Sequence, residues 1–235
     1  MVLLLLLGKT IMKVLIFGKE SDLIIDLVKR SGFEIVQKDP EIIVSYGGDG
    51  TLMHSEFEFP SVPKLVLKGS RICKLCANFP NEEILERVKN GKYKVEEFMK
   101  LEAALNGKKL SALNDIVIHN GDPRHAIRYR MSVNGKEIGN EIIGDGLVMA
   151  TPLGSTGYYR SITDSFFEVG IGVAFNNSTE QSDHMVLRED SVISVKVARG
   201  PAIVYADNQS DSITLGEEEE LIVKKSEKTA KIVRV

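Results

Sequence analysis

The pentapeptide Gly47-Gly48-Asp49-Gly50-Thr51 directly follows the apolar run Ile42-Ile43-Val44, which is typical of a buried strand. Three glycines within four residues permit a sharp turn and let a ligand approach the backbone closely. Successive N–H groups in such a turn suit a phosphate. A carboxylate in this place, that of Asp49, can hold Mg²⁺ or accept a proton from an attacking hydroxyl. A plain tight turn, with Asp49 capping a following helix, is the alternative.

The segments around this loop predict alternating strands and helices. A helix opened by Ser21 and ended near Gly32 lies between two expected strands. This order favours a parallel sheet, in which ligands bind at the carboxyl ends of the strands. The expected strands are Lys13–Phe17, Phe33–Val36, Ile42–Ser45 and Leu65–Leu67, and a second helix is expected at Glu82–Lys89, opened by Asn81.

From about Lys92 onward the pattern changes to strands and turns. Asn106-Gly107 and Asn134-Gly135 are hairpin signals. We therefore expect an α/β N-terminal domain with a parallel sheet over residues 1–95 and a β-rich, sandwich-like C-terminal domain over residues 96–235, with a cleft between them. The expected strands of the second domain are Ala126–Val133, Leu147–Ala150, Ser191–Val197, Ala202–Ala206, Ser212–Leu215, Leu221–Val223 and Lys231–Val233.

Composition and charge favour small-molecule partners. A net charge of -3 over 235 residues gives no electrostatic footprint for nucleic acid. The apolar run at residues 2–7 is too short to span a membrane and lacks the flanks of a signal peptide. Residues 1–11 are either an upstream start or an extra edge strand. We expect a cytoplasmic protein with no membrane partner.

Cys73 and Cys76 are spaced as C-x-x-C, which fits half a zinc site or a redox couple. The sequence has no second pair, and its four histidines show no ligand spacing. We therefore expect two ordinary reduced thiols in a cytosolic protein, and no metal ligands from the chain.

A second dense stretch runs from Gly144 to Tyr158 (GDGLVMATPLGSTGY). The apolar strand Leu147–Ala150 has glycine, hydroxyl and carboxylate residues on both sides. Ser155 and Thr156 can present hydroxyls to a polar ligand, and Tyr158 offers a flat face to an aromatic base. A strand that leads through a capped turn is the alternative.

Four segments together resemble the NAD kinase family, in the family's order and over most of the chain. They are Gly47–Thr51, Leu113–Val117 (LNDIV), Gly144–Tyr158 and Asp207-Asn208-Gln209. The glycine loop alone is shared with phosphofructokinases and lipid kinases, whereas the Thr-Pro-x-Gly-Ser-Thr segment singles out NAD kinases. The layout expected above is similar to that family's fold.

The chain departs from the family at four places. Asp115 stands where a glutamate is usual, and Gly157 where an alanine is usual. Ile162–Ser165 replaces a Gly-Gly-Pro segment, and Ile72-Cys73-Lys74 replaces Leu-Gly-Phe. The binding loops near these segments are the least transferable parts of the resemblance.

The resemblance implies phosphoryl transfer from ATP or polyphosphate to the 2′-hydroxyl of the adenosine ribose of NAD, with Mg²⁺. Asp49 would accept the hydroxyl proton. Asn114 and Asp115 would hydrogen-bond the dinucleotide, and Asp145 would contact its nicotinamide end. The other expected binding residues are Thr156 on the adenine, Tyr158 stacked on the nucleotide, and Gly48, Gly50, Thr51, Gly157, Arg160, Ser161 and Gln209 at further contacts.

Several readings stay open from the sequence. The glycine loop also fits a lipid or sugar kinase, and the altered loops fit an NAD(P)-binding regulatory protein without catalysis. Arg160 is the best phosphate partner among the arginines near the site, while Arg124, Arg128 and Arg130 favour a solvated face. Tyr159 is expected to pack in the core. By resemblance the protein forms a homodimer or homotetramer.

Overall fold

The computed structural model describes residues 11–71, 73–179 and 184–235. The expectation for the N-terminal segment 1–10 lies outside them. The chain forms two compact units, one from residues up to Glu96 together with Lys231–Val235, and one from Glu97–Ala230. The sequence placed the last five residues in the second domain, but their strand pairs with β4 of the first sheet.

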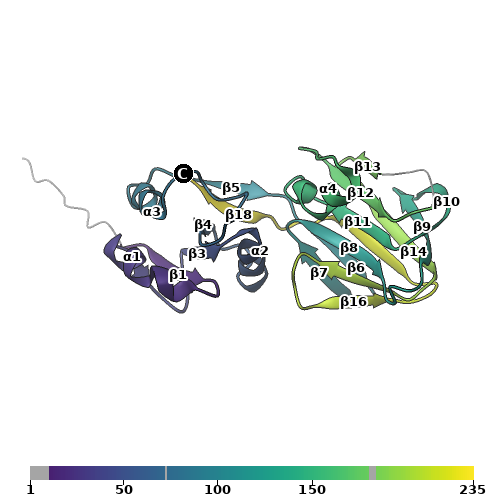
Figure 1. The fold of residues 1–235 in the computed structure, drawn as a ribbon, viewed down its shortest axis with the longest axis horizontal. Coiled ribbons are helices and arrows are strands. Elements are labelled where there is room, and N and C mark those ends of the chain that lie inside the picture. Colours follow the sequence, from purple (N-terminus) through teal and green to yellow (C-terminus); the bar gives the residue numbers. More distant parts are fainter. Residues whose placement is uncertain (1–10, 72, 180–183) are drawn as a thin grey trace, which may run out of the picture. The chain divides into compact units, whose positions relative to one another are not determined.

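The first unit contains one sheet of six strands in the order β2-β1-β3-β4-β18-β5 (Figure 1). The pairs β1·β2, β1·β3, β3·β4 and β4·β18 are parallel, which confirms the expected α/β class. The strands are β1 (Lys13–Phe17), β2 (Glu34–Ile35), β3 (Ile42–Gly47), β4 (Lys64–Lys68), β5 (Lys94–Phe98) and β18 (Ala230–Arg234).

Helices pack on this sheet through a core of buried aliphatic residues that includes Val28, Val44 and Leu85. The first helical segment begins as a 3₁₀ turn at Ser21, with Glu20 at the N-cap and no side-chain cap. The prediction that Ser21 is the N-cap is therefore wrong. The helices are η1 (Ser21–Ile24), α1 (Ile25–Arg30), α2 (Asp49–Glu58) and α3 (Asn81–Lys89). Within the described ranges, no helix is long and apolar enough to cross a membrane.

The second unit contains two six-stranded sheets, whose orders are β10-β9-β14-β17-β6-β7 and β13-β12-β11-β8-β15-β16. Every pair that defines these sheets is antiparallel. The strands are β6 (Leu101–Leu105), β7 (Lys108–Ala112), β8 (Asp115–Asn120), β9 (Ile127–Val133), β10 (Lys136–Gly144), β11 (Gly146–Ala150), β12 (Ile171–Asn176), β13 (His184–Leu187), β14 (Ile193–Arg199), β15 (Ala202–Ala206), β16 (Ser212–Leu215) and β17 (Glu220–Lys225).

Side chains from both sheets form one core, as the alternating burial of strands such as β9 requires. This confirms the sandwich-like second domain. A smaller core lies where the short helix α4 (Tyr158–Thr163) packs on β11 and β12. Tyr159 is fully buried there against Phe167 and His184, as the sequence predicted.

Candidate active site

The glycine loop joins β3 to α2 at the carboxyl end of a parallel strand. Gly48 takes the N-cap position, and the helix begins at Asp49. A Cβ atom at Gly47 would lie 2.2 Å from Oγ1 of Thr51, so any other residue there would force the Thr51 side chain to move. Thr51 N and Leu52 N donate to the Gly48 carbonyl, and a helix start of this kind suits an anion.

The carboxylate of Asp49 does not cap its own helix but accepts two backbone hydrogen bonds from the loop between β4 and α3. Lys74 N donates to Oδ2 at 3.1 Å, and Leu75 N donates to Oδ1 at 3.0 Å. Oδ1 also lies 3.7 Å from Sγ of Cys73. The side chain is half-buried, so these contacts fix its direction while leaving it accessible.

Cys73 and Cys76 form a disulfide, so the prediction of two reduced thiols is wrong. The loop turns back on itself and brings the two Cα atoms to 5.4 Å, within the range that a disulfide bridges. Spacing alone could not show this, because an extended C-x-x-C segment would hold its two Cα atoms about 10 Å apart, too far for a disulfide.

In the second unit, Asp207 organises the Asn114-Asp115 segment from 92 residues further along the chain. Its carboxylate accepts N–H bonds from Leu113 and Asn114, each at 2.7 Å, and from Asp115 at 3.0 Å. The predicted binding residue Gln209 also bonds this region, since its Nε2 donates to the carbonyl of Ser111 at 2.7 Å. The sequence indicated Asp207 only as a member of the Asp207-Asn208-Gln209 segment and predicted no role for its side chain.

Two carboxylates lie close together in this place, and both have a raised pKa. Desolvation, with a further contribution from the charge of Asp207, raises the pKa of Asp115 to about 7. Desolvation also raises the pKa of Asp207, while its three backbone donors act in the opposite direction. Beside them, Oδ1 of Asn114 is buried and has no hydrogen-bond partner among the described residues.

The turn after β11 packs tightly against this segment. Thr151 donates through Oγ1 to the carbonyl of Leu113 at 2.7 Å, and its N–H donates to the carbonyl of Asn114 at 2.8 Å. A Cβ atom at Gly154 would lie 2.1 Å from the Asn114 carbonyl oxygen. A Cβ atom at Gly157 would lie 4.0 Å from Oδ2 of Asp115. The structure thus brings two of the predicted motifs together.

The remaining predicted residues of the second unit lie around the ends of β11 and β12. Asp145 accepts from the side-chain amides of Asn120 at 3.2 Å and Asn177 at 3.0 Å. The Tyr158 hydroxyl accepts from Nδ2 of Asn176 at 3.2 Å, and the side chain is 38% exposed. The other predicted members of this segment are Thr156 in the 3₁₀ turn η2 (Gly154–Thr156), Arg160, which is exposed, and Ser161, whose hydroxyl donates to the Tyr158 carbonyl.

Arginines on the neighbouring strands are paired with carboxylates. Arg124 bonds Asp122, and Arg128 lies 3.3 Å from Glu141. Both pairs are largely exposed, which agrees with the solvated face that the sequence favoured for them.

A glycine loop followed by an accessible carboxylate at a helix start is typical of one class of protein, the phosphotransferases. The model of the ATP-NAD kinase C-terminal domain matches residues 113–235. An NAD kinase from Sulfurisphaera tokodaii is 31% identical over 241 residues, with 95% of each chain covered. One from Methanothermobacter thermautotrophicus is 30% identical over 88% of this chain and 76% of its own. The chain belongs to the NAD kinase family.

Solved structures agree with this assignment at the level of the fold. The crystal structure of an NAD kinase from Archaeoglobus fulgidus in complex with ATP matches with a TM-score of 0.76 at 24% identity, covering 95% of this chain and 93% of that one. Yeast NADH kinase complexed with NADH matches with a TM-score of 0.81 at 18% identity, covering 97% and 84%.

Proposed function

We propose that this NAD kinase family enzyme transfers the terminal phosphoryl group of ATP, or of polyphosphate, to the 2′-hydroxyl of the adenosine ribose of NAD, and that Asp49 accepts the hydroxyl proton. The observation that carries the proposal is the accessible carboxylate of Asp49 at the start of α2, directly after the glycine loop. A carboxylate held there by two N–H donors is oriented without being consumed, since it offers about four lone-pair sites.

The chemistry asks mainly for positioning and for stabilisation of charge. Phosphoryl transfer passes through a loose transition state, so the protein forms no covalent bond to the transferred group in this scheme. The ribose oxygen forms a bond to phosphorus, the bond to the leaving phosphate oxygen breaks, and the hydroxyl proton moves to an Asp49 oxygen as the new bond acidifies it. The N–H groups of the glycine loop and of the α2 start would bind phosphate oxygens.

The second unit supplies groups suited to a dinucleotide. The unpartnered Oδ1 of Asn114 is a buried acceptor, and a buried acceptor without a donor costs about 1–3 kcal/mol, which a ligand N–H or O–H would recover. Asp115 beside it can accept or, when protonated, donate a hydrogen bond. Tyr158 would stack on the nucleotide.

Magnesium is expected to arrive with the phosphoryl donor. Among the described residues, no group of three or more His, Cys, Asp or Glu side chains is arranged to hold a metal. Mg²⁺ in kinases is commonly bound by substrate phosphates and one or two carboxylates, and Asp49 can supply one. When bound, the ion would neutralise charge that develops on the transferred group.

The remaining expectations stay predictions. They are the roles of Gly48, Gly50, Thr51, Asp145, Thr156, Gly157, Arg160, Ser161 and Gln209 in ligand binding, a homodimer or homotetramer, and a cytoplasmic location.

The deciding experiment incubates the purified enzyme with NAD, Mg²⁺ and either ATP or polyphosphate, and measures NADP by chromatography. We expect NADP to form with equimolar ADP in the ATP arm. Omission of Mg²⁺ and replacement of NAD by a sugar or by diacylglycerol are the control arms. Absence of NADP with both donors would overturn the proposal, and phosphorylation of the sugar or lipid instead would favour the other kinase class.

A further inference from the structure

Specific hydrogen bonds connect the described part of the loop between β4 and α3 to the rest of its unit. Gly69 N donates to the carbonyl of Gly47 at 2.9 Å where the loop begins, and the side chain of Asn81 bonds both backbone groups of Lys68 where it ends. Between these points the described residues form bends without a helix or strand. Specific links therefore help to fix the conformation of the described part of the loop.

One of those links is the disulfide, and it encloses the two residues that bond Asp49. Lys74 and Leu75 lie between Cys73 and Cys76, and they supply the N–H groups that reach the two carboxylate oxygens. A ring closed over four residues restricts the backbone rotations that aim both N–H groups. Sγ of Cys73 itself lies 3.7 Å from Oδ1 of Asp49.

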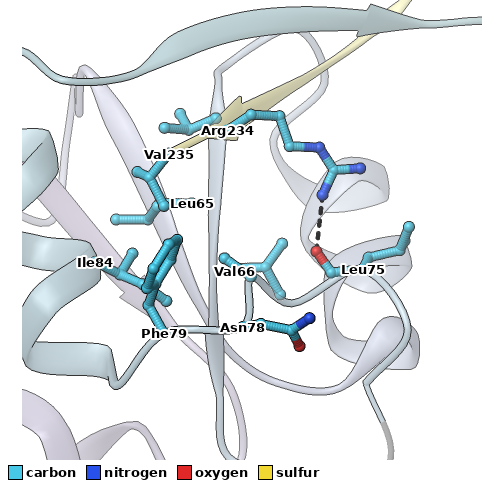
Figure 2. Close-up of a pocket in the computed structure, with 10 residues that line it drawn as sticks. Leu65, Val66, Leu75, Asn78, Phe79, Ile84, Arg234 and Val235 are labelled. Atoms are coloured by element: carbon cyan, nitrogen blue, oxygen red, sulfur yellow. Dashed lines mark hydrogen bonds between the residues drawn. The ribbon is translucent and has the colours of Figure 1, made fainter.

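A second link holds the other side of Leu75. Figure 2 shows Nη1 of Arg234, on β18, donating to the Leu75 carbonyl at 2.8 Å. Arg234 also lies near Glu96 of β5, with Nε 3.5 Å from Oε2. The backbone of Leu75 thus bonds both Asp49 and Arg234, and so connects Asp49 to β18.

The loop has room to move if the ring opens. Leu75 and Arg234 line a pocket of about 330 Å³ whose other walls include Leu65, Phe79 and Ile84 (Figure 2). A closely packed interior would resist such a shift, whereas an existing pocket lets the Leu75 backbone turn away from Asp49.

We propose that the Cys73–Cys76 disulfide is a redox-sensitive positioning element for Asp49, so that the enzyme is most active when the bond is intact. A dithiol reduces it by thiolate attack on one sulfur and resolution of the mixed disulfide by the second thiol. Two electrons and two protons then reside on Cys73 and Cys76, and the dithiol becomes a cyclic disulfide. The open loop no longer aims both N–H groups, and the carboxylate loses its fixed direction toward the ribose hydroxyl.

This inference rests on the proposed function, and one experiment tests both. NADP formation is followed before and after treatment with dithiothreitol, and free thiols are counted with a chromogenic thiol reagent. We expect kcat to fall about 10-fold, with roughly 10²-fold as the upper bound for a misplaced catalytic group. The KM values for NAD and ATP should change far less, because the loop acts on the carboxylate and not on affinity. Reoxidation should restore kcat.

Matched variants separate the disulfide from general effects of the reductant. The chain has two cysteines, so Cys73→Ser, Cys76→Ser and the double variant leave nothing else to reduce. All three should show the lowered kcat of the reduced enzyme and no response to dithiothreitol. Leu75→Pro removes one N–H donor and should lower kcat in the oxidised enzyme.

The outcomes are distinct. No NADP in either redox state would overturn the proposed function. Equal kcat in both states, with the two thiols counted as free after treatment, would overturn the positioning role, and so would a higher kcat after reduction. A lower melting temperature with unchanged kcat would also overturn it, because the bond would then serve only to hold the fold together.

Discussion

Asp49 and Asp207 are two carboxylates that both accept backbone N–H groups, yet their surroundings differ. Asp49 takes two donors from an irregular loop closed by a disulfide. Asp207 takes three donors from residues at the edge of β8, inside the sandwich unit. The Asp49 carboxylate is held by an irregular loop and keeps lone pairs that a ligand could use. The Asp207 carboxylate uses its oxygens for three hydrogen bonds within the fold. The same kind of contact therefore orients an accessible carboxylate in one unit and connects distant segments of the fold in the other.

The largest effect that would break this comparison concerns Asp49. Asp49→Asn removes the proton acceptor, and we expect kcat for NADP formation to fall by about 10²–10⁴-fold, the usual size of a general-base contribution. The free energy of unfolding should stay within about 1 kcal/mol of the wild type, as for most substitutions outside the core. Asp26→Asn, at an exposed site on α1, is the matched control. A variant that phosphorylates NAD at a near wild-type rate would end the assignment.

Asp207→Asn should have the reverse profile. An amide offers one acceptor oxygen and places an NH₂ group beside N–H donors, so we expect a loss of about 2–4 kcal/mol in the free energy of unfolding, from the size of hydrogen bonds to charged groups. Urea unfolding followed by circular dichroism measures it, and Asp211→Asn, which is exposed, is the control. Unchanged stability together with lost catalysis would mean that Asp207 works on the ligand.

Protonation of Asp115 should make the free energy of unfolding depend on pH. Because its pKa is raised to about 7 in the folded chain, the native state keeps a proton that the unfolded state releases above about pH 4. The free energy of unfolding should therefore fall as pH rises from about 4 to about 7, by up to about 1.4 kcal/mol per unit of pKa difference. Urea unfolding across this range should show a shallower fall for Asp115→Asn than for the wild type. An identical slope would contradict the assignment.

The smallest expected effect concerns Tyr158, the residue proposed to stack on the nucleotide. Tyr158→Ala should raise the KM for NAD by about 5–30-fold, since stacking of a base on an aromatic ring contributes about 1–2 kcal/mol. Tyr205→Ala on β15 is the control, because both tyrosines are 38% exposed. No change in the KM for NAD would assign Tyr158 to packing on its neighbours.

Local patterns were enough to predict the parts of the fold that depend on neighbouring residues. The strand, glycine loop and following turn around Asp49 could be predicted because glycine spacing and an apolar run act over a few residues. The hairpin signals of the second unit indicated its β-rich character for the same reason. The helix opened near Ser21 was placed correctly, but its cap was not, since the chain enters it through a 3₁₀ turn.

The missed features depend on contacts between distant segments. Asp207 bonds residues 92–94 positions earlier, a pairing that no local pattern contains. The disulfide depends on how the loop folds over Asp49, which two cysteines and two intervening residues do not specify. The last strand was expected at the right residues but with the wrong partner sheet, because its apolar pattern suits either sheet equally.

The return of β18 to the sheet of β4 has a consequence for biosynthesis. The sheet that carries the glycine loop receives this strand only after the whole sandwich unit has been translated. A nascent chain halted before Ala230 would contain every residue of the glycine loop. It would lack Arg234, and with it the bond to Leu75. Emergence of the final strand from the ribosome is then the step that completes the hydrogen bonds from β18 through Leu75 to the carboxylate of Asp49.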